Sequence, residues 1–515
     1  MAALTVLAGM VVVAHLTQAS PMPVEQRHPM ITPAPTLDLP TRTLIEQRGV
    51  LDDLKSDVDS VFSKLGSAVP SYVASVQQLT NGKGVPNFFQ DFPTKDKVQS
   101  SLGVDDKQLA ALPTQVLNLP PYGNWSRGSW NVRFHGNVYK QPPTDQKTID
   151  DLANKFLVDV NIDQLPPDEQ ANARNMTASI FVVQQEDQNV TMHLEPAPSA
   201  GSDGEKGGGG ATTASGGEQS VNLPYLTTDQ GDFDVFVPIQ LNGLMRGDTN
   251  TSVQRLNVYA NGTNTGNATA YLVPPTGLSI ISDIDDILRV TKIYKPKDGL
   301  LNSFAKPFTP WMNMPDIYAK WARQYPTMHF HYLTTTPEQV TRNYMDFIYK
   351  TYPGGSFDTR PLNFSDVSAT LSIRKFLLEK FFQTFPQRKI VLVGDTSNSD
   401  IMRDYPGLVK DFPGQVQCIL LRNTSATDPD DLFPYDTSGF KGLDQKLFMF
   451  FRTPDDLTNI DLQNGNCYNS SVPQNITFSR QAELLGIHGS GADRIGKGWL
   501  ISLLVSALTA SILLL

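Results

Sequence analysis

Acidic and hydroxyl residues follow short apolar segments in the second half of the chain. Asp283 and Asp285 end the first segment, Thr334 ends a second, and Asp395 ends a third, with Asp400 five residues further on. Asp283 and Asp285 are two positions apart, so both project to one side of an extended chain. Carboxylates this close repel and need a cation or a shared proton. Mg²⁺ prefers such oxygen ligands, so the pattern indicates metal-assisted phosphoryl transfer.

A positive charge for the transition state is available between the second and third segments. Arg374 and Lys375 lie near the start of a predicted helix over 371–385. Each signal is weak by itself, because a lone Asp-x-Asp is usually a turn and a Gly-Asp pair often caps a helix. Their order at the ends of successive predicted strands is what favours a catalytic site.

The elements that must position these residues are predicted strands alternating with amphipathic helices. Short apolar strands separated by helices indicate a parallel sheet covered on both faces, with chemistry beyond the carboxyl ends of its strands. The predicted strands are LSIISD (278–283), MHFHYLT (328–334), KIVLVGD (389–395) and VQCILLR (416–422), and the predicted helices include PEQVTRNYMDFIYKT (337–351) and LSIRKFLLEKFFQTF (371–385).

A different pattern precedes this region. Alternating or β-branched runs such as SWNVRFHGNVYK, ASIFVVQQ, DFDVFVPIQL and ATAYLVPP are separated by turn residues, which predicts a β-sandwich over 120–276. Residues 199–220 are rich in Gly and Ser, cannot bury a core, and are predicted to be a loop insertion.

Both ends of the chain have the character of targeting segments. Residues 1–19 form a short apolar run that ends in small residues, which is typical of a secretory signal peptide, although a buried N-terminal helix is the alternative. Residues 493–515 contain a spacer and an uncharged tail, which favours a GPI signal over a tail anchor. We therefore expect a secretory protein at the cell surface or outside the cell, attached to the membrane through its C-terminal anchor.

Ten Asn-x-Ser/Thr sequons support the same location. They occur at Asn124, Asn175, Asn189, Asn250, Asn261, Asn267, Asn363, Asn423, Asn469 and Asn475. In the secretory pathway Cys418 and Cys467 could form one disulfide, or they could remain unpaired.

Several stretches outside the two main regions complete the predicted organisation. An amphipathic helical segment over 44–80 packs on the main body or contacts a membrane or partner. The full prediction is a signal peptide (1–19), a flexible lead (20–43), this helical segment, the β-sandwich domain (120–276), a catalytic domain (277–455), a C-terminal extension (456–492) and the GPI-signal-like spacer and tail (493–515).

Composition limits the classes of function. The chain has 515 residues, 40% of them hydrophobic, which is enough for a sizeable core. Its formal net charge is −10, which argues against a nucleic-acid-binding protein. Two cysteines exclude a disulfide-rich scaffold and a cysteine-based zinc site.

The motifs SDIDDILRVT, FHYLTTTPEQV, PGGSFDTR and FPQRKIVLVGDTSNSD resemble those of the haloacid dehalogenase superfamily. More narrowly they resemble the fungal phosphatidate phosphatase of the actin-patch-protein type. The resemblance is strong over about 277–425. It implies an α/β fold with a haloacid-dehalogenase-like Rossmannoid parallel sheet, preceded here by the predicted β-sandwich domain. It also implies a Mg²⁺-dependent phosphatase that converts phosphatidate to diacylglycerol through an aspartyl-phosphate, with phospholipid as substrate.

The resemblance assigns a role to each matching residue. Asp283 would be the nucleophile, Asp285 the acid and base, Thr334 a ligand of the phosphoryl oxygens, and Arg374 or Lys375 the cation. The implied metal ligands are Asp283, the backbone carbonyl of Asp285, Asp395 and Asp400, and the implied substrate contacts are Ser356, Phe357 and Arg360.

The chain departs from the family pattern in three places. In the basic third motif, Arg374 stands where Lys is usual, with Lys375 next to it. Ile287 stands where Thr or Val is usual, and Glu338 stands where Trp usually follows the proline. An acid near a phosphate site repels an anionic substrate, so a phosphatase of soluble phosphomonoesters is an alternative. A glycosylated cell-surface binding protein with a catalytically weak core is a third hypothesis.

Overall fold

The fold was analysed in a computed structural model. It describes residue 99 and residues 102–157, 160–197, 212–213, 216–228, 231–337, 341–360, 367–428 and 437–474. The predictions for 1–19, 20–43, 44–80 and 493–515, and the departure at Glu338, fall outside the described residues.

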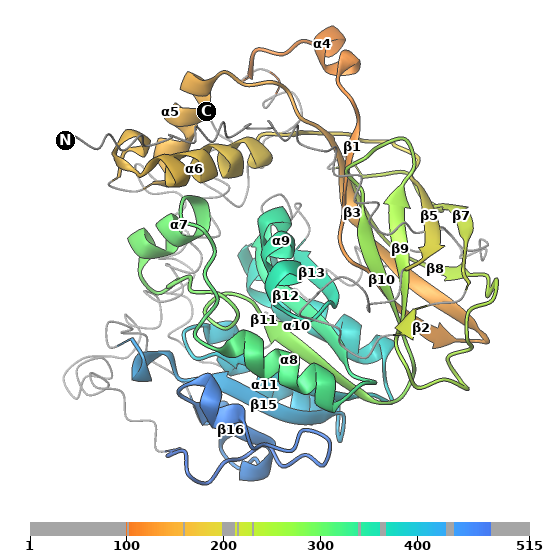
Figure 1. Cartoon of the computed structure of the whole chain (residues 1–515), viewed down its shortest axis with the longest axis vertical. Coiled ribbons are helices and arrows are strands. Elements are labelled where there is room, and N and C mark those ends of the chain that lie inside the picture. The colour runs from red at the N-terminus through yellow and green to blue at the C-terminus, as the bar shows by residue number, and fades with distance from the viewer. Residues whose placement is uncertain are drawn as a thin grey trace, which may run out of the picture.

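Among the described residues, a six-stranded parallel sheet forms the C-terminal half of the molecule (Figure 1). Its strand order is β13-β12-β11-β14-β15-β16. The strands are β11 (Leu278–Asp283), β12 (His329–Pro337), β13 (Ser356–Arg360), β14 (Lys389–Asp395), β15 (Val416–Arg422) and β16 (Phe448–Phe451). The predicted parallel α/β sheet is confirmed, and it also contains β13 and β16, which periodicity did not predict.

Helices cover both faces of this sheet, so its strands are apolar along their whole length. Ile280 and Phe330 belong to the core that contains α8, and Ile281 and Leu333 belong to the core that contains α10 and α11. The described α-helices are α4 (Asp106–Ala111), α5 (Gln146–Phe156), α6 (Pro167–Ile180), α7 (Pro296–Phe304), α8 (Met314–Gln324), α9 (Thr341–Thr351), α10 (Val367–Thr384) and α11 (Ser399–Asp411). Short 3₁₀ turns occur at η1 (Ile162–Gln164), η3 (Thr424–Ala426), η4 (Ser438–Phe440), η5 (Gln445–Leu447) and η6 (Pro454–Leu457).

The N-terminal half is built on a second sheet, which contains ten strands in the described part of the chain. Its strands are β1 (Gln115–Asn118), β2 (Tyr122–Ser126), β3 (Ser129–Lys140), β4 (Val183–Gln184), β5 (Thr191–Pro196), β6 (Thr212–Thr213), β7 (Gln219–Asn222), β8 (Asp232–Ile239), β9 (Gln254–Ala260) and β10 (Ala268–Val273). Hydrogen bonds link all ten into one sheet, so the predicted β-sandwich, with two separate packed sheets, is not confirmed. The long strand β3 is its centre, because it pairs with β1, β2, β4 and β8.

Two segments of this half differ from the sequence predictions. The run ASIFVVQQ, predicted as a strand over 178–185, is helical up to Ile180 and extended only at Val183–Gln184. A short apolar run fits a helix end or a strand equally well, and packing against α7 decides between them here. Within the Gly-rich segment 199–220, β6 pairs with β9, and β7 begins there at Gln219 and pairs with β5 through its last residue, Asn222.

The helices α5 and α6 follow β3 and pack on α7, which belongs to the C-terminal half (Figure 1). Met176 and Phe181 meet Leu300 and Phe304 in one small buried cluster. The N-terminal half thus extends over the connection between β11 and β12.

A buried charge network joins the two sheets. The Arg133 guanidinium on β3 donates to Asp234 on β8 at 2.8 and 2.9 Å and to Asp358 on β13 at 2.5 Å. Asp358 also accepts from His135 Nδ1 at 3.2 Å, and Lys380 on α10 lies 2.6 Å from Asp234. Arg133 and Asp358 are 2% and 0% exposed, so water cannot replace either partner.

A second group of buried polar side chains lies on β12 and β13. Ser356 Oγ lies 2.8 Å from His331 Nδ1 and 2.9 Å from His329 Nε2, and all three side chains are buried. Burial lowers the pKa of His331 to about 4, with Arg133 adding to the effect and Asp358 opposing it. Burial also lowers the pKa of His329 well below its usual range, so both histidines are neutral in the folded protein near neutral pH.

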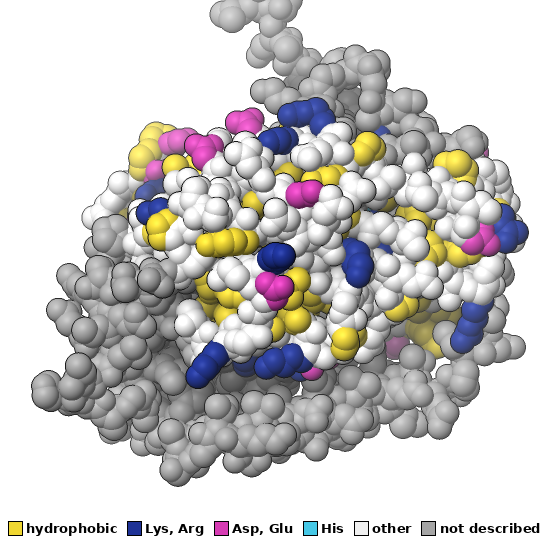
Figure 2. All heavy atoms as spheres, turned by 90° about the horizontal axis from the view of Figure 1, so that it is seen from below, with side chains coloured by type: hydrophobic (Ala, Val, Ile, Leu, Met, Phe, Trp, Pro, Cys, Tyr) yellow, Lys and Arg dark blue, Asp and Glu magenta, His cyan; other side chains and the backbone are white. Residues whose placement is uncertain are grey.

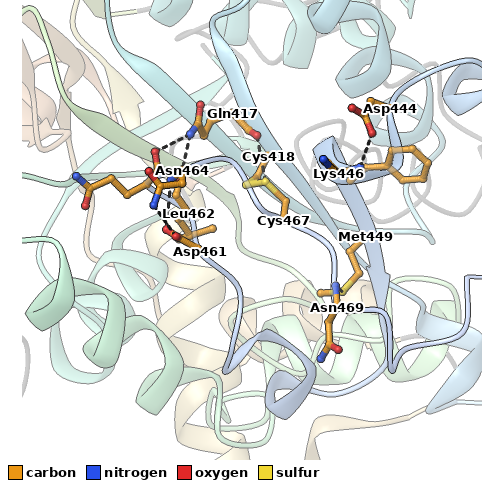
Figure 3. The surroundings of a disulfide bond; sticks show 12 residues. Gln417, Cys418, Asp444, Lys446, Met449, Asp461, Leu462, Asn464, Cys467 and Asn469 are labelled. Carbon is orange, nitrogen blue, oxygen red and sulfur yellow. Dashed lines mark hydrogen bonds between the residues drawn. A yellow bond between two sulfur atoms is a disulfide. The ribbon is translucent and has the colours of Figure 1, made fainter.

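Cys418 on β15 and Cys467 form a disulfide, which closes a separation of 49 residues (Figure 3). The question that the sequence left open is thereby answered in favour of pairing. Next to it, Gln417 Nε2 donates to the carbonyl oxygens of Leu462 and Gln463 at 3.1 and 2.9 Å. The segment after η6 is consequently fastened to the β15–β16 side of the sheet.

The described surface is mixed in character. On the face seen in Figure 2, Lys and Arg side chains are scattered among Asp, Glu and apolar side chains and do not merge into one basic area. No helix in the described ranges has the length and apolar character needed to cross a bilayer.

Replacing Arg133 tests the charge network. Arg133→Ala removes the buried cation that both Asp234 and Asp358 bind. We therefore expect the free energy of unfolding to fall by about 3–5 kcal/mol. Urea unfolding followed by fluorescence measures it. The matched control is Arg246→Ala in the same half, because Arg246 pairs with Asp248 at an exposed position. An equal effect of both substitutions would contradict a special role for the buried network.

The neutral histidines predict a specific loss of stability in acid. The folded pKa of His331 lies below the unfolded value of about 6.5, so its contribution is complete above that pH and is lost as pH falls toward 4. The loss is roughly 3 kcal/mol for a shift of this size. Thermal melts of His331→Asn and the natural chain between pH 7 and 4 check this. The variant should show the shallower pH dependence, and parallel curves would refute the assignment.

Candidate active site

The carboxyl ends of three neighbouring parallel strands bring the first set of predicted residues together. Asp283 ends β11 and is paired in register with Leu333 on β12, directly before Thr334. Asp395 ends β14, the neighbour of β11 on its other side. Asp283, Thr334 and Asp395 are 2%, 2% and 0% exposed. This edge lies where the strand order reverses, which is the usual place for a site in such sheets.

Arg374 reaches this edge from α10. Its Nη1 donates to Asp283 Oδ1 at 2.9 Å, and its Nε donates to Asp400 Oδ2 at 2.6 Å. The guanidinium therefore bridges the end of β11 and the first turn of α11. Lys375, the alternative cation, is not brought to the site, because it pairs with Glu379 and Asp411 on the helix surface.

Asn398 links the two buried carboxylates. Its Nδ2 lies 3.4 Å from Asp283 Oδ2 and also donates to Asp395 Oδ2. Asp395 Oδ1 accepts from the backbone N–H of Ser397 at 2.7 Å and from the Ser397 hydroxyl. One oxygen of Asp283 and one of Asp395 thus share the Asn398 amide nitrogen as a neighbour.

The electrostatics of this pair suit a bound cation. Burial raises the pKa of Asp283 well above its usual range; Asp395 and Asp285 raise it further, and Arg374 offsets only part of the rise. Burial, with Asp286 nearby, raises the pKa of Asp395 to about 6. Burial also acts to raise the pKa of Asp400, but Arg374 outweighs it and the net pKa is lowered.

The donor set agrees with a hard divalent ion in chemistry, although it is not a complete ligand shell. Asp283 and Asp395 supply carboxylate oxygens, the kind of ligand that Mg²⁺ prefers, and both lie against the same Asn398 amide. Asp400 is turned toward Arg374 instead. Over the described ranges, no group of three or more His, Cys, Asp or Glu side chains is arranged to hold a metal ion.

The Asp285 side chain has different partners from those of Asp283 and Asp395. Its Oδ1 accepts from the Thr291 hydroxyl at 2.7 Å and from Tyr344 OH at 3.1 Å, and lies 3.4 Å from Arg289 Nε. The side chain remains 14% exposed, so a substrate can reach it.

The loop after β11 is fixed by Asp286, which sequence reasoning did not select. Asp286 has a φ of 58°, a left-handed conformation that Asp adopts more readily than most residues. Its carboxylate accepts from the backbone N–H groups of Thr291, Lys292 and Ile293 at 2.8 to 3.1 Å. Arg422 at the end of β15 donates to the backbone carbonyl of Asp286.

The remaining predicted residues lie in different surroundings. Thr334 Oγ1 accepts from the backbone N–H of Thr336 at 3.1 Å, so it is held at the end of β12. Ser356 lies between His329 and His331, away from the carboxylates, and Arg360 is the last residue of β13.

Sequence reasoning also missed Asn398, Arg289 and Tyr344. Asn398 follows the predicted strand closely enough to be found by inspecting the whole loop up to Asp400. The other two come from a loop and a helix, and no local pattern marks them.

Comparisons with known proteins cover the part of the chain that contains these residues. Residues 278–423 match the family model described as phosphatidate phosphatase APP1, catalytic domain. Phosphatidate phosphatase APP1 of Saccharomyces cerevisiae is 26% identical over 168 residues, which cover 31% of this chain and 28% of the yeast protein. The similarity thus spans less than a third of either protein, and no solved structure matches significantly. The two matches support a phosphatase enzyme whose catalytic segment is similar to that of phosphatidate phosphatase APP1.

Proposed function

We propose that this chain is a Mg²⁺-dependent phosphatidate phosphatase of the haloacid dehalogenase type, which acts through an aspartyl-phosphate. The observation that carries the proposal is the position of Asp283. Its buried carboxylate ends the central strand β11, faces the Arg374 guanidinium at 2.9 Å, and shares Asn398 with Asp395. The match of residues 278–423 to the phosphatidate phosphatase catalytic domain supports the substrate class.

In the first half of the reaction, Asp283 attacks phosphorus while the bond from phosphorus to the alcohol oxygen breaks. Protonated Asp285 gives its proton to the leaving oxygen, because an alkoxide is a poor leaving group. In this proposal Thr334 holds a phosphoryl oxygen, and Arg374 offsets the negative charge that develops.

In the second half, Asp285 takes a proton from water, which attacks phosphorus and breaks the bond to Asp283. Phosphate leaves, and both carboxyl groups return to their starting states. Asp283, Asp395 and the backbone carbonyl of Asp285 would hold Mg²⁺, joined by Asp400 if it turns from Arg374. When bound, the ion would neutralise charge on the phosphoryl group.

The test compares phosphate release by the full chain and by Asp283→Asn. We expect Mg²⁺-dependent release from phosphatidate in mixed micelles, lost with EDTA and reduced about 1,000-fold or more by the substitution. Asp346→Asn is the matched control, because Asp346 is an exposed carboxylate on α9. Unchanged release by Asp283→Asn would refute the mechanism.

The substrate arm of the same assay separates the other hypotheses. Release from a small aryl phosphate but not from phosphatidate would move the substrate to soluble phosphomonoesters, which the net charge of −10 favours. No release from either substrate by folded protein would favour a cell-surface binding protein.

We further propose that the protein enters the secretory pathway and is held at the cell surface by a GPI anchor. The terminal segments 1–19 and 493–515 support this, and so does the Cys418–Cys467 disulfide, because disulfides persist in oxidising compartments. Among the described sequons, Asn175, Asn189 and Asn261 are exposed.

Two enzymatic treatments of cells that express the full chain test the location. Peptide N-glycosidase should increase the gel mobility of the protein, since glycans add mass at exposed sequons. A phosphatidylinositol-specific phospholipase C should release it from the membrane fraction. Glycan removal without release would contradict only the GPI anchor. No change with either enzyme would contradict the secretory location as well.

A further inference from the structure

Asp285, the proposed acid and base, is held by contacts that fall mainly on one of its two oxygens. Oδ1 accepts from Thr291 Oγ1 at 2.7 Å and from Tyr344 OH at 3.1 Å, and it lies 3.4 Å from Arg289 Nε. Within the described part of the chain, Oδ2 accepts one hydrogen bond, a longer one of 3.3 Å from Tyr344 OH. The asymmetry leaves Oδ2 as the oxygen that can carry a proton.

Arg289 fixes the ring of Tyr344 in turn. Its fully buried guanidinium lies 3.7 Å from the Phe308 ring centroid and 4.8 Å from the Tyr344 ring centroid. Its Nη2 donates to Asn302 O and Ser303 Oγ, both at 3.1 Å. A cation held between two aromatic faces and two acceptors restricts the phenol to one position.

Tyr344 also connects Asp285 to the phosphoryl side of the site. Thr336 Oγ1 donates to Tyr344 OH at 3.5 Å and accepts from Thr334 Oγ1 at 3.1 Å. The helix α9 therefore contributes, through Tyr344, to the geometry between Thr334 and Asp285.

We propose that Tyr344 is a positioning residue for Asp285, directing the Oδ2 hydrogen toward the leaving oxygen of the substrate. The inference rests on the proposed function, since it assigns Asp285 the proton transfer. As the phosphorus–oxygen bond breaks, the bonding pair goes to the leaving oxygen, which takes the proton from Oδ2. Asp285 is left as a carboxylate that accepts from Tyr344 and Thr291.

The proposal predicts a dependence on the leaving group. An alkyl phosphate such as phosphatidate releases a strongly basic oxygen and needs the proton in the transition state. p-Nitrophenyl phosphate releases a weakly basic phenolate, which departs with little help. Loss of positioning should therefore slow the first substrate much more than the second. Because kcat/KM covers steps up to the departure of the alcohol, it reports this transfer without the later hydrolysis.

The test is kcat/KM for dioctanoyl phosphatidate and for p-nitrophenyl phosphate in the full-length enzyme and in Tyr344→Phe. The substitution removes the hydroxyl and keeps the ring between Arg289 and Phe308. We expect kcat/KM to fall about 10- to 100-fold with phosphatidate and less than about 3-fold with p-nitrophenyl phosphate. Thr291→Val, which removes the 2.7 Å contact, should show the same selectivity to a smaller degree.

Tyr349→Phe is the matched control, because it also removes a phenol hydroxyl from α9. That hydroxyl donates to Gly355 O at 2.6 Å, outside the site. This control should leave the ratio of the two kcat/KM values unchanged. Equal losses on both substrates, or no loss, in folded Tyr344→Phe would overturn the inference. The proposed function would still stand in that case if Asp283→Asn remained inactive, so the two failures are distinguishable.

Discussion

Two buried carboxylates, Asp283 and Asp395, lie at the ends of neighbouring strands, and their mutual repulsion is the constraint on which the rest of the site depends. Arg374 is the cation that Asp283 meets, and it comes from α10 rather than from the sheet. The helix must therefore be held in one rotation about its axis. Phe381 and Leu378 in the core hold one side, and Lys375 lies on the helix surface in ion pairs.

The N-terminal half takes part in fixing that rotation. Lys380 on α10 lies 2.6 Å from Asp234, which belongs to the same charge network as Arg133 and Asp358. A contact on the ten-stranded sheet thus restrains the helix that supplies Arg374. Although β13 is an edge strand of the parallel sheet, its Asp358 is completely buried, because Arg133 on β3 pairs with it. The N-terminal half therefore helps to hold α10, and with it Arg374, in position.

Much of the sheet could be predicted, because parallel strands buried on both faces are continuously apolar. The strands over 278–283, 389–395 and 416–422 have the predicted bounds. Residues at their ends meet because the strands are parallel, so order along the chain was sufficient to bring Asp283 and Asp395 together. Tyr344 and Arg289 could not be found this way, since a helix and a loop place them and only packing sets their distance from Asp285. The single connected sheet of the N-terminal half was also not predictable, because alternation shows which residues face a core but not which strands pair.

The long separation within the charge network has a consequence for biosynthesis. Asp234 follows Arg133 after 101 positions, but Asp358 follows after 225. At about 5–20 residues per second, the ribosome delivers Asp358 roughly 10–45 s after Arg133. During that interval the nascent N-terminal sheet can form its pair with Asp234 while the side of β3 that will meet β13 is still open. If the N-terminal sheet forms first, Arg133 has Asp234 as its partner before Asp358 is synthesised, and the network is completed only when β13 docks on β3.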